Sequence, residues 1–96
     1  MTRLEQLQRW YLAQCDGEWE HDYGVDISTL DNPGWRLKIN LEGTPLSGRP
    51  FVRLETHRTD DDWVVCWVEK SCFHAASGPL NLEEALGVFL DWAGAL

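Results

Sequence analysis

The feature that most constrains the fold of this chain is a strict alternation of apolar and polar residues from Trp35 to Glu42. The apolar members are Trp35, Leu37, Ile39 and Leu41, and the polar members are Arg36, Lys38, Asn40 and Glu42. Because successive side chains of a β-strand point to opposite faces, this pattern predicts a strand with one buried and one solvated face. A slip of one residue would place every apolar member in water, so the register of the strand is strongly specified.

The residues before this strand predict its antiparallel partner. Tyr23, Val25 and Ile27 alternate with small or polar residues, which indicates a second strand with one solvated face. A type II turn is expected from Asn32 to Trp35, because proline presets its second position and glycine supplies the positive φ of its third. The two strands are therefore expected to pair as a hairpin.

The segment after the alternating strand predicts further β structure. Its expected parts are a loop from Gly43 to Pro50, an irregular strand from Phe51 to about His57, a turn at Asp60 to Asp62, a strand from Trp63 to Val68, and a short last strand from Cys72 to Ala75. The strand from Trp63 to Val68 is apolar on both faces, so it is expected to be central in the sheet or covered on both sides. The strand near Phe51 is a candidate exposed edge that could support a dimer. Strand order and oligomeric state stay open.

Helical periodicity marks both ends of the chain. The first apolar stripe consists of Leu4, Leu7, Trp10 and Tyr11, and the second of Leu82, Ala85, Leu86, Phe89, Leu90 and Ala93. The first predicted helix runs from Thr2, which with Glu5 has the spacing of a capping box, to about Gln14. Asp16 and Gly17 are expected to end it.

The second predicted helix begins after Asn81, which lies three residues ahead of Glu84 in an N-cap arrangement. Gly87 lies inside this helix at a cost of about 1 kcal/mol relative to alanine. That cost is best explained if the helix packs closely on the sheet at this point.

Together these patterns predict an α+β fold, in which an antiparallel sheet of four or five strands is flanked by an N-terminal and a C-terminal helix. A chain of 96 residues has room for one hydrophobic core, so residues 1–96 are expected to form a single domain. The hydrophobic fraction of 44% and the six tryptophans exclude a disordered chain.

The stretch from Cys15 to Trp35 carries six carboxylates and three aromatic residues without a lysine or arginine. Its negative potential favours a basic partner protein, although acidity can also serve solubility alone. The net charge of −8 would be repelled by phosphates, so no direct nucleic-acid binding is expected. The residues that we expect to bind a partner are Asp16, Glu18, Trp19, Glu20, Asp22 and Asp26.

The tryptophans are expected to divide between the core and the surface. Trp10, Trp35 and Trp92 fall on or beside apolar stripes and are predicted to lie in the core. Trp19 lies amid carboxylates, which makes it the best candidate for an exposed anchor that stacks on an arginine of the partner.

A cytoplasmic location is expected. The first residues mix charged with apolar side chains, unlike a signal peptide, and the longest apolar run, Trp63 to Val68, is too short to cross a bilayer. Cys15, Cys66 and Cys72 cannot all pair within one chain and show no C-x-x-C spacing, so they are interpreted as reduced thiols. No cofactor and no membrane partner are predicted.

Two other functional classes remain as alternatives. Glu18, Glu20, His21 and Asp22 are residue types that bind a divalent metal, as in a small metal-dependent hydrolase. If they lie on a strand, however, His21 would point away from the three carboxylates. A pairing of Cys15 with His21 as nucleophile and base is disfavoured, because nearby negative charge raises the pKa of a thiol. The second alternative is a peptide-binding module that adds a partner strand at a sheet edge.

Two long motifs resemble one known family. They are W-Y-x-x-x-C-D-G-E-W-E-H-x-Y-G-V-x-I-x-T-L-D-N-P-G-W, from Trp10 to Trp35, and G-P-L-N-L-E-E, from Gly78 to Glu84. In this order they are similar to the immunity protein 53 family, and the resemblance spans nearly the whole chain. It implies a cytoplasmic antidote of a bacterial polymorphic toxin system, encoded beside a toxin that it binds without catalysis. The expected partner is therefore a cognate toxin domain with a basic surface.

Overall fold

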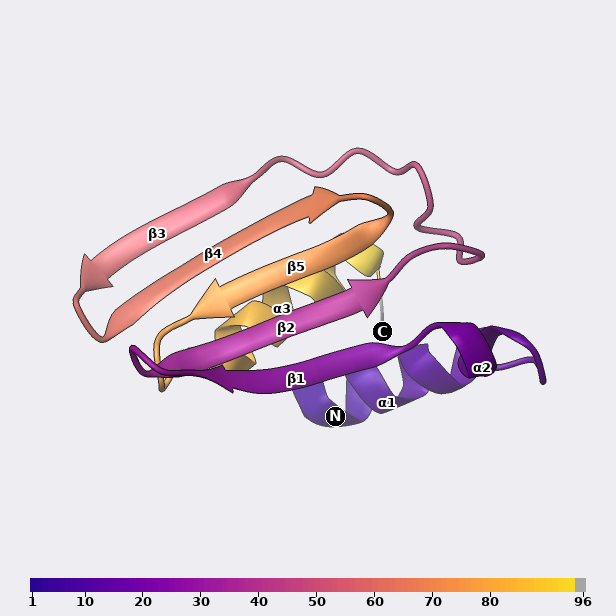
Figure 1. Ribbon diagram of the computed structural model, residues 1–96, viewed down its shortest axis with the longest axis horizontal. Helices are drawn as coiled ribbons and strands as arrows, with labels where there is room; N and C mark the ends of the chain where they lie inside the picture. Colours follow the sequence, from indigo (N-terminus) through magenta and orange to yellow (C-terminus); the bar gives the residue numbers. More distant parts are fainter. Residues whose placement is uncertain (95–96) are drawn as a thin grey trace.

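The structure is a computed structural model that describes residues 1–94. In chain order its elements are α1 (Arg3–Gln14), α2 (Trp19–Asp22), β1 (Val25–Leu30), β2 (Gly34–Asn40), β3 (Leu54–Thr59), β4 (Asp62–Glu69), β5 (Cys72–Ser77) and α3 (Leu82–Ala93) (Figure 1). None of the helices in this part of the chain combines the length and apolar character needed to span a membrane.

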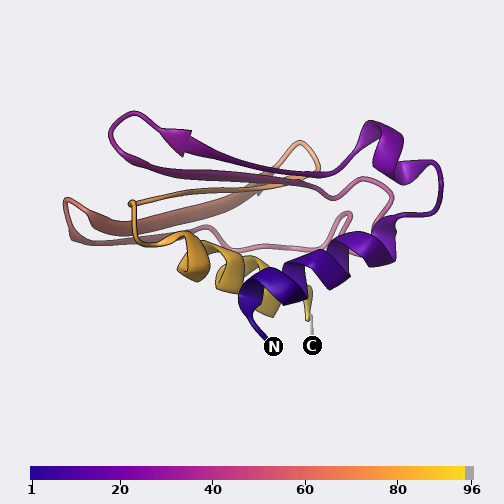
Figure 2. The ribbon, with the colours of Figure 1, turned by 90° about the horizontal axis from the view of Figure 1, so that it is seen from below.

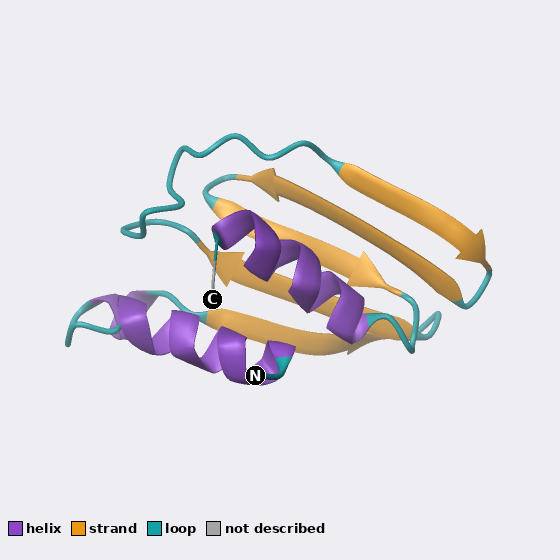
Figure 3. Ribbon diagram, turned by 180° about the vertical axis from the view of Figure 1, so that it is seen from behind, coloured by secondary structure: helices purple, strands orange, loops and turns teal. Residues whose placement is uncertain are grey.

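The five strands form one antiparallel sheet in the order β1-β2-β5-β4-β3. Helices α1 and α3 both lie on the same face of this sheet, and the opposite face carries no helix (Figures 2 and 3). The molecule thus has two layers, which confirms the predicted α+β fold with a helix near each end of the chain. The last strand along the chain, β5, is central, whereas β1 and β3 are the edges.

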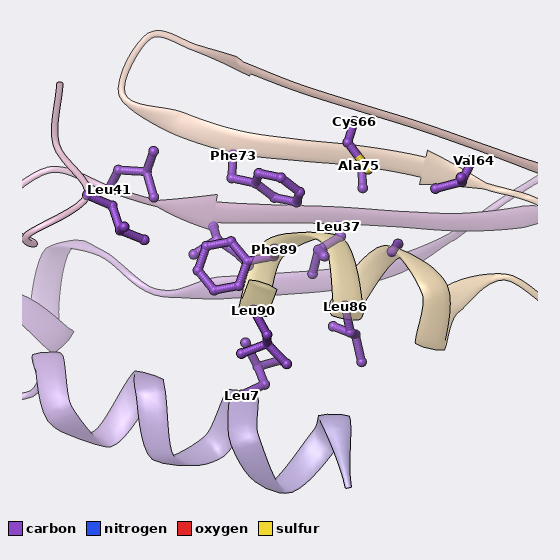
Figure 4. Close-up of a cluster of buried hydrophobic side chains, with 13 residues drawn as sticks. Leu7, Leu37, Leu41, Val64, Cys66, Phe73, Ala75, Leu86, Phe89 and Leu90 are labelled. Carbon is purple, nitrogen blue, oxygen red and sulfur yellow. The ribbon is translucent and has the colours of Figure 1, made fainter. Parts of the chain in front are cut away.

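The core lies between the helices and the sheet face that they cover. The alternation of β2 is confirmed, because Leu37 and Ile39 are fully buried while Arg36 on the other face is exposed. Residues from β4, β5, α1 and α3 complete this core, as Figure 4 shows: Leu7, Val64, Cys66, Phe73, Ala75, Leu86, Phe89 and Leu90. The interior position predicted for the strand at Trp63 to Val68 is also confirmed, since β4 lies between β5 and β3.

The predicted turn after β1 is wrong in type. The turn occupies residues 31–33, and Gly34 is already the first residue of β2, paired with Leu30 and without positive φ. Glycine is needed there for another reason: a Cβ on Gly34 would lie 2.1 Å from the carbonyl oxygen of Ser77. Gly34 therefore permits the close approach of β2 to Ser77, the last residue of β5.

Several strand boundaries also differ from the predictions. The first strand begins at Val25 rather than Tyr23, and Ile27 is 40% exposed because β1 is an edge strand that the helices cover only in part. The irregular strand begins at Leu54, and Phe51 precedes it in the loop. The last strand extends to Ser77.

The first helix lies where it was predicted, but one residue of its apolar stripe and its C-terminal end differ from the prediction. The Thr2 hydroxyl caps α1 by accepting from the Glu5 N–H at 3.1 Å, whereas Leu4 is 54% exposed instead of lying on a buried stripe. The helix ends at Gln14 with extended backbone at Cys15, so Gly17, although at φ 95°, lies beyond the cap.

Asn81 is the N-cap residue of α3, as predicted, but its side chain has another role, and the explanation predicted for Gly87 is wrong. The Asn81 side chain forms no capping bond; its amide donates instead to the carboxylates of Asp62 at 2.9 Å and Glu84 at 3.1 Å. Gly87 does not face the sheet. A Cβ there would lie 3.3 Å from Nε of Arg3, so this glycine makes room for an α1 side chain.

We expect Gly34→Ala to destabilise the protein by about 2–3 kcal/mol, because the new Cβ forces β2 and β5 apart. Gly24→Ala is the matched control: a Cβ there meets no atom within 4 Å, so its effect should stay within about 0.5 kcal/mol. Urea denaturation of both variants measures the two values. Equal effects would contradict the close approach at Gly34.

Candidate functional site

Within the acidic stretch, residues Trp19–Asp22 form a short helix, α2. On the strand that the sequence analysis considered for these residues, His21 would point away from the carboxylates. The turn before it is held by its own carboxylates. The Oδ1 atom of Asp16 accepts from the N–H groups of Glu18 and Trp19, both at 2.9 Å. The Glu20 carboxylate reaches back to the N–H groups of Asp16 and Gly17, at 3.0 and 2.9 Å. Two of the predicted partner-binding carboxylates therefore bind the protein's own backbone.

These hydrogen bonds stabilise the charged form of both groups. The N–H of Trp19 and then that of Glu18 lower the pKa of Asp16 below its ordinary value of 3.8. The pKa of Glu20 is likewise lowered by backbone N–H groups, those of Glu20 itself, Asp16 and Gly17. At neutral pH both side chains are thus ionised while they hold the turn.

Trp19 is buried, with 7% of its surface exposed, so the prediction that it is an exposed anchor is wrong. Its indole N–H donates to the Glu42 carbonyl oxygen at 2.8 Å. Its ring centroid lies 6.0–6.3 Å from those of Trp10, Tyr11 and Tyr23. Trp19 is the central ring of this aromatic cluster, which attaches α2 to α1 and to the loop after β2.

The three tryptophans that were predicted to lie in the core are all partly buried. Trp10 and Trp92 are partly buried and pack against the core. Trp35 is half-buried, and its indole N–H donates to the Pro79 carbonyl oxygen at 2.9 Å.

A cleft of about 540 Å³ opens beside this cluster, where α1, the end of α2 and the start of β1 meet. Its lining includes Tyr11, His21, Asp22, Tyr23, Asp26 and Asn40. Asn40 fixes the backbone of Gly24 at the cleft. Its side-chain Oδ1 accepts from the Gly24 N–H at 2.9 Å, and its backbone N–H donates to the Gly24 carbonyl oxygen at 3.0 Å.

The cleft brings together two of the predicted site residues, Asp22 and Asp26, both exposed and without a hydrogen-bonded or ion-pair partner among residues 1–94. The rings of Tyr11 and Tyr23, each 37% exposed, stand beside them. Carboxylates and aromatic faces both attract cations, so the cleft is suited to a lysine or arginine side chain. Glu18 is exposed but does not line the cleft.

The sequence analysis missed the two tyrosines as site residues. Tyr11 was assigned to the buried stripe of a helix, and Tyr23 to the buried face of a strand. Their phenol groups were the available signal, because tyrosine combines an apolar ring with a polar tip and is enriched at interfaces. What the sequence did not reveal is that both rings pack against Trp19 and line the same cleft.

The geometry does not favour the metal-dependent alternative. Glu20 is committed to backbone N–H groups, and residues 1–94 contain no group of three or more His, Cys, Asp or Glu side chains placed to hold a metal ion. The thiol of Cys15 donates to the Tyr11 carbonyl oxygen at 3.3 Å. Cys66 and Cys72 are buried free thiols.

Comparison with models of known families identifies a match. The family model described as Immunity protein 53 matches residues 4–94. No curated protein and no solved structure matches the chain.

We expect Asp16→Ala to lower the urea midpoint at pH 7, because it leaves the N–H groups of Glu18 and Trp19 without their acceptor. The lowered pKa of Asp16 means that its contribution is complete above the ordinary value and is lost as the pH falls through the lowered one. The difference from wild type should therefore shrink between pH 7 and pH 3. Asp22→Ala, which removes no such bond, should change the midpoint little at either pH. A difference that stays constant on acidification would contradict this role.

Proposed function

The chain belongs to the immunity protein 53 family, and from this premise we propose that it neutralises a cognate bacterial toxin by binding a basic side chain of the toxin in the cleft beside α2. Family membership supports the toxin-neutralising role. The observation that supports the site is the convergence of Asp22 and Asp26 with the rings of Tyr11 and Tyr23 on one cleft. Neutralisation then results from occupancy of the toxin's surface, without catalysis.

The six residues predicted to bind a partner divide into two groups on physical grounds. Asp22, Asp26 and Glu18 are exposed, so their charges are available to a partner. Asp16, Glu20 and Trp19 position them: the two carboxylates hold the turn, and the buried indole holds α2 against α1. We therefore propose Asp22 and Asp26 as direct contacts and Glu18 as a charge at the rim.

The net charge of −8 supports a basic partner. Complementary potentials raise association rates by factors of about 10 to 1,000 at low salt, and this advantage falls as ionic strength rises. Because Asp22 and Asp26 are unpaired within residues 1–94, an incoming cation does not have to break an existing ion pair. We propose that the toxin encoded beside this gene is the partner and that the two meet in the cytoplasm.

The test is co-expression of the chain with that toxin, followed by a growth assay and size-exclusion chromatography. Wild type should rescue growth and co-purify with the toxin domain. The double variant Asp22→Lys/Asp26→Lys should weaken binding at least about 30-fold and reduce its dependence on salt, since two attractive charges become repulsive.

The matched control is Asp60→Lys/Asp61→Lys, which changes the net charge equally. These aspartates are exposed in the turn between β3 and β4, at the end of the sheet opposite α2 (Figure 1). This control should bind within about threefold of wild type, because only long-range electrostatics changes. Rescue without a complex, or equal losses in both double variants, would overturn the proposed site.

A further inference from the structure

The sheet face opposite α1 and α3 carries a cross-strand row of cationic and aromatic side chains. Lys38 on β2 pairs in register with His74 on β5, which pairs with Trp67 on β4. Arg53, directly before β3, continues the row, with its Cζ atom 5.4 Å from the centroid of the Trp67 ring. Since neighbouring strands lie about 4.8 Å apart, the row spans about 14 Å. Lys38, His74 and Trp67 alternate with the buried residues of their strands, so they lie on the sheet face opposite the core. That face is the one without α1 and α3 in Figure 2.

The row is ordered before any partner arrives. The rings of Trp67 and His74 are stacked, with centroids 5.2 Å apart and an interplanar angle of 12°. The Trp67 indole N–H donates to the Glu69 carboxylate at 3.1 Å. A large aromatic ring that is already fixed loses little conformational entropy on binding, which is a property of residues that contribute strongly to interfaces.

An apolar floor lies next to the row. Arg36 pairs in register with Ala76, which pairs with Val65, and both of these side chains are partly or fully buried. We call the surface formed by Arg36, Lys38, Arg53, Val65, Trp67 and His74 the open face. It combines an apolar centre with charges at its sides, which is the usual composition of a protein interface.

The charges of the open face that have no partner within residues 1–94 are mainly cationic. Arg36 and Lys38 form no salt bridge within residues 1–94, although the chain carries twice as many acidic as basic residues. Three carboxylates border the face. Glu55 is paired with Arg53 and His57, and Glu69 accepts from the Trp67 indole. Asp26 on β1 pairs in register with Lys38 and forms no salt bridge with it. Burial of its ring lowers the pKa of His74, so the unpaired positive charge comes from Arg36 and Lys38.

We propose that the open face binds an acidic segment of the toxin polypeptide, as a second contact of opposite polarity to the cleft. This inference rests on the proposed function, because it takes the toxin as partner. Carboxylates of the segment would pair with Arg36 and Lys38, while an apolar side chain would cover Trp67 and Val65. A single-stranded nucleic acid could also stack on such rings, but the net charge of −8 opposes it.

The test is the affinity of purified Arg36→Glu and Lys38→Glu for the purified toxin domain, measured by calorimetry. Both changes make the chain more acidic, so a toxin bound only at the acidic cleft would bind them equally or more tightly. The open face predicts the reverse, a loss of at least about tenfold for each. The control Arg9→Glu makes the same charge change on the exposed side of α1 and should not weaken binding.

Two further measurements address the chemistry of the partner. Trp67→Ala, checked for an unchanged urea midpoint, should also lose at least about tenfold in affinity. Amidation of the toxin's carboxylates should weaken its binding to wild type and weaken binding to Arg36→Glu/Lys38→Glu much less, since the cationic partners are already gone.

The outcomes separate this inference from the proposed function. If Asp22→Lys/Asp26→Lys loses affinity while Arg36→Glu and Lys38→Glu do not, the open face is not a toxin contact and the proposed function stands. If wild type does not bind the toxin at all, both fail. If wild type binds an oligo-dT probe, the two glutamate variants lose that binding and the toxin complex is unaffected, the occupant is nucleic acid and the inference is overturned.

Discussion

The pairing of β2 with β5 is the interaction on which the rest of the structure depends. It joins the hairpin of β1 and β2 to the strands β3, β4 and β5, and it aligns Leu37 with Ala75 and Ile39 with Phe73 beneath the helices. The same register aligns Lys38 with His74 and Arg36 with Ala76 on the uncovered face. Because a strand alternates between faces, one register sets both the core and the open face.

The aromatic cluster around Trp19 has a comparable role for the acidic surface. It buries the indole, and the helix that carries Trp19 turns Asp22 outward beside Tyr11 and Tyr23. Two neighbouring carboxylates, Asp16 and Glu20, are used to form the turn that makes this possible. The negative charge of the segment thus has two uses: part of it holds the backbone, and part of it faces solvent.

The sequence predicted the elements that local periodicity specifies, which are β2, β4, the bodies of α1 and α3, and the fold class. The prediction failed where the environment of a residue is set by residues that are distant in the sequence. Trp19 is surrounded by carboxylates in sequence, yet its side chain is buried. Its indole N–H donates to the carbonyl oxygen of Glu42, 23 positions away. Gly34 resembled a turn glycine, but its requirement comes from Ser77 on a strand that pairs with β2 in three dimensions. Helix α2 has only 4 residues and depends on side-chain to backbone hydrogen bonds, which leave no periodic signal.

The most direct measurement is an NMR titration of the isotopically labelled protein with the toxin domain encoded beside its gene. The account predicts that the amide resonances from Asp22 to Asp26 shift on binding, together with the phenol ring signals of Tyr11 and Tyr23. The amides of Asp60 and Asp61, at the other end of the sheet, should stay in place. Shifts confined to that distant turn or to the outer side of α3, with the cleft unchanged, would contradict the claim that the cleft beside α2 holds the toxin.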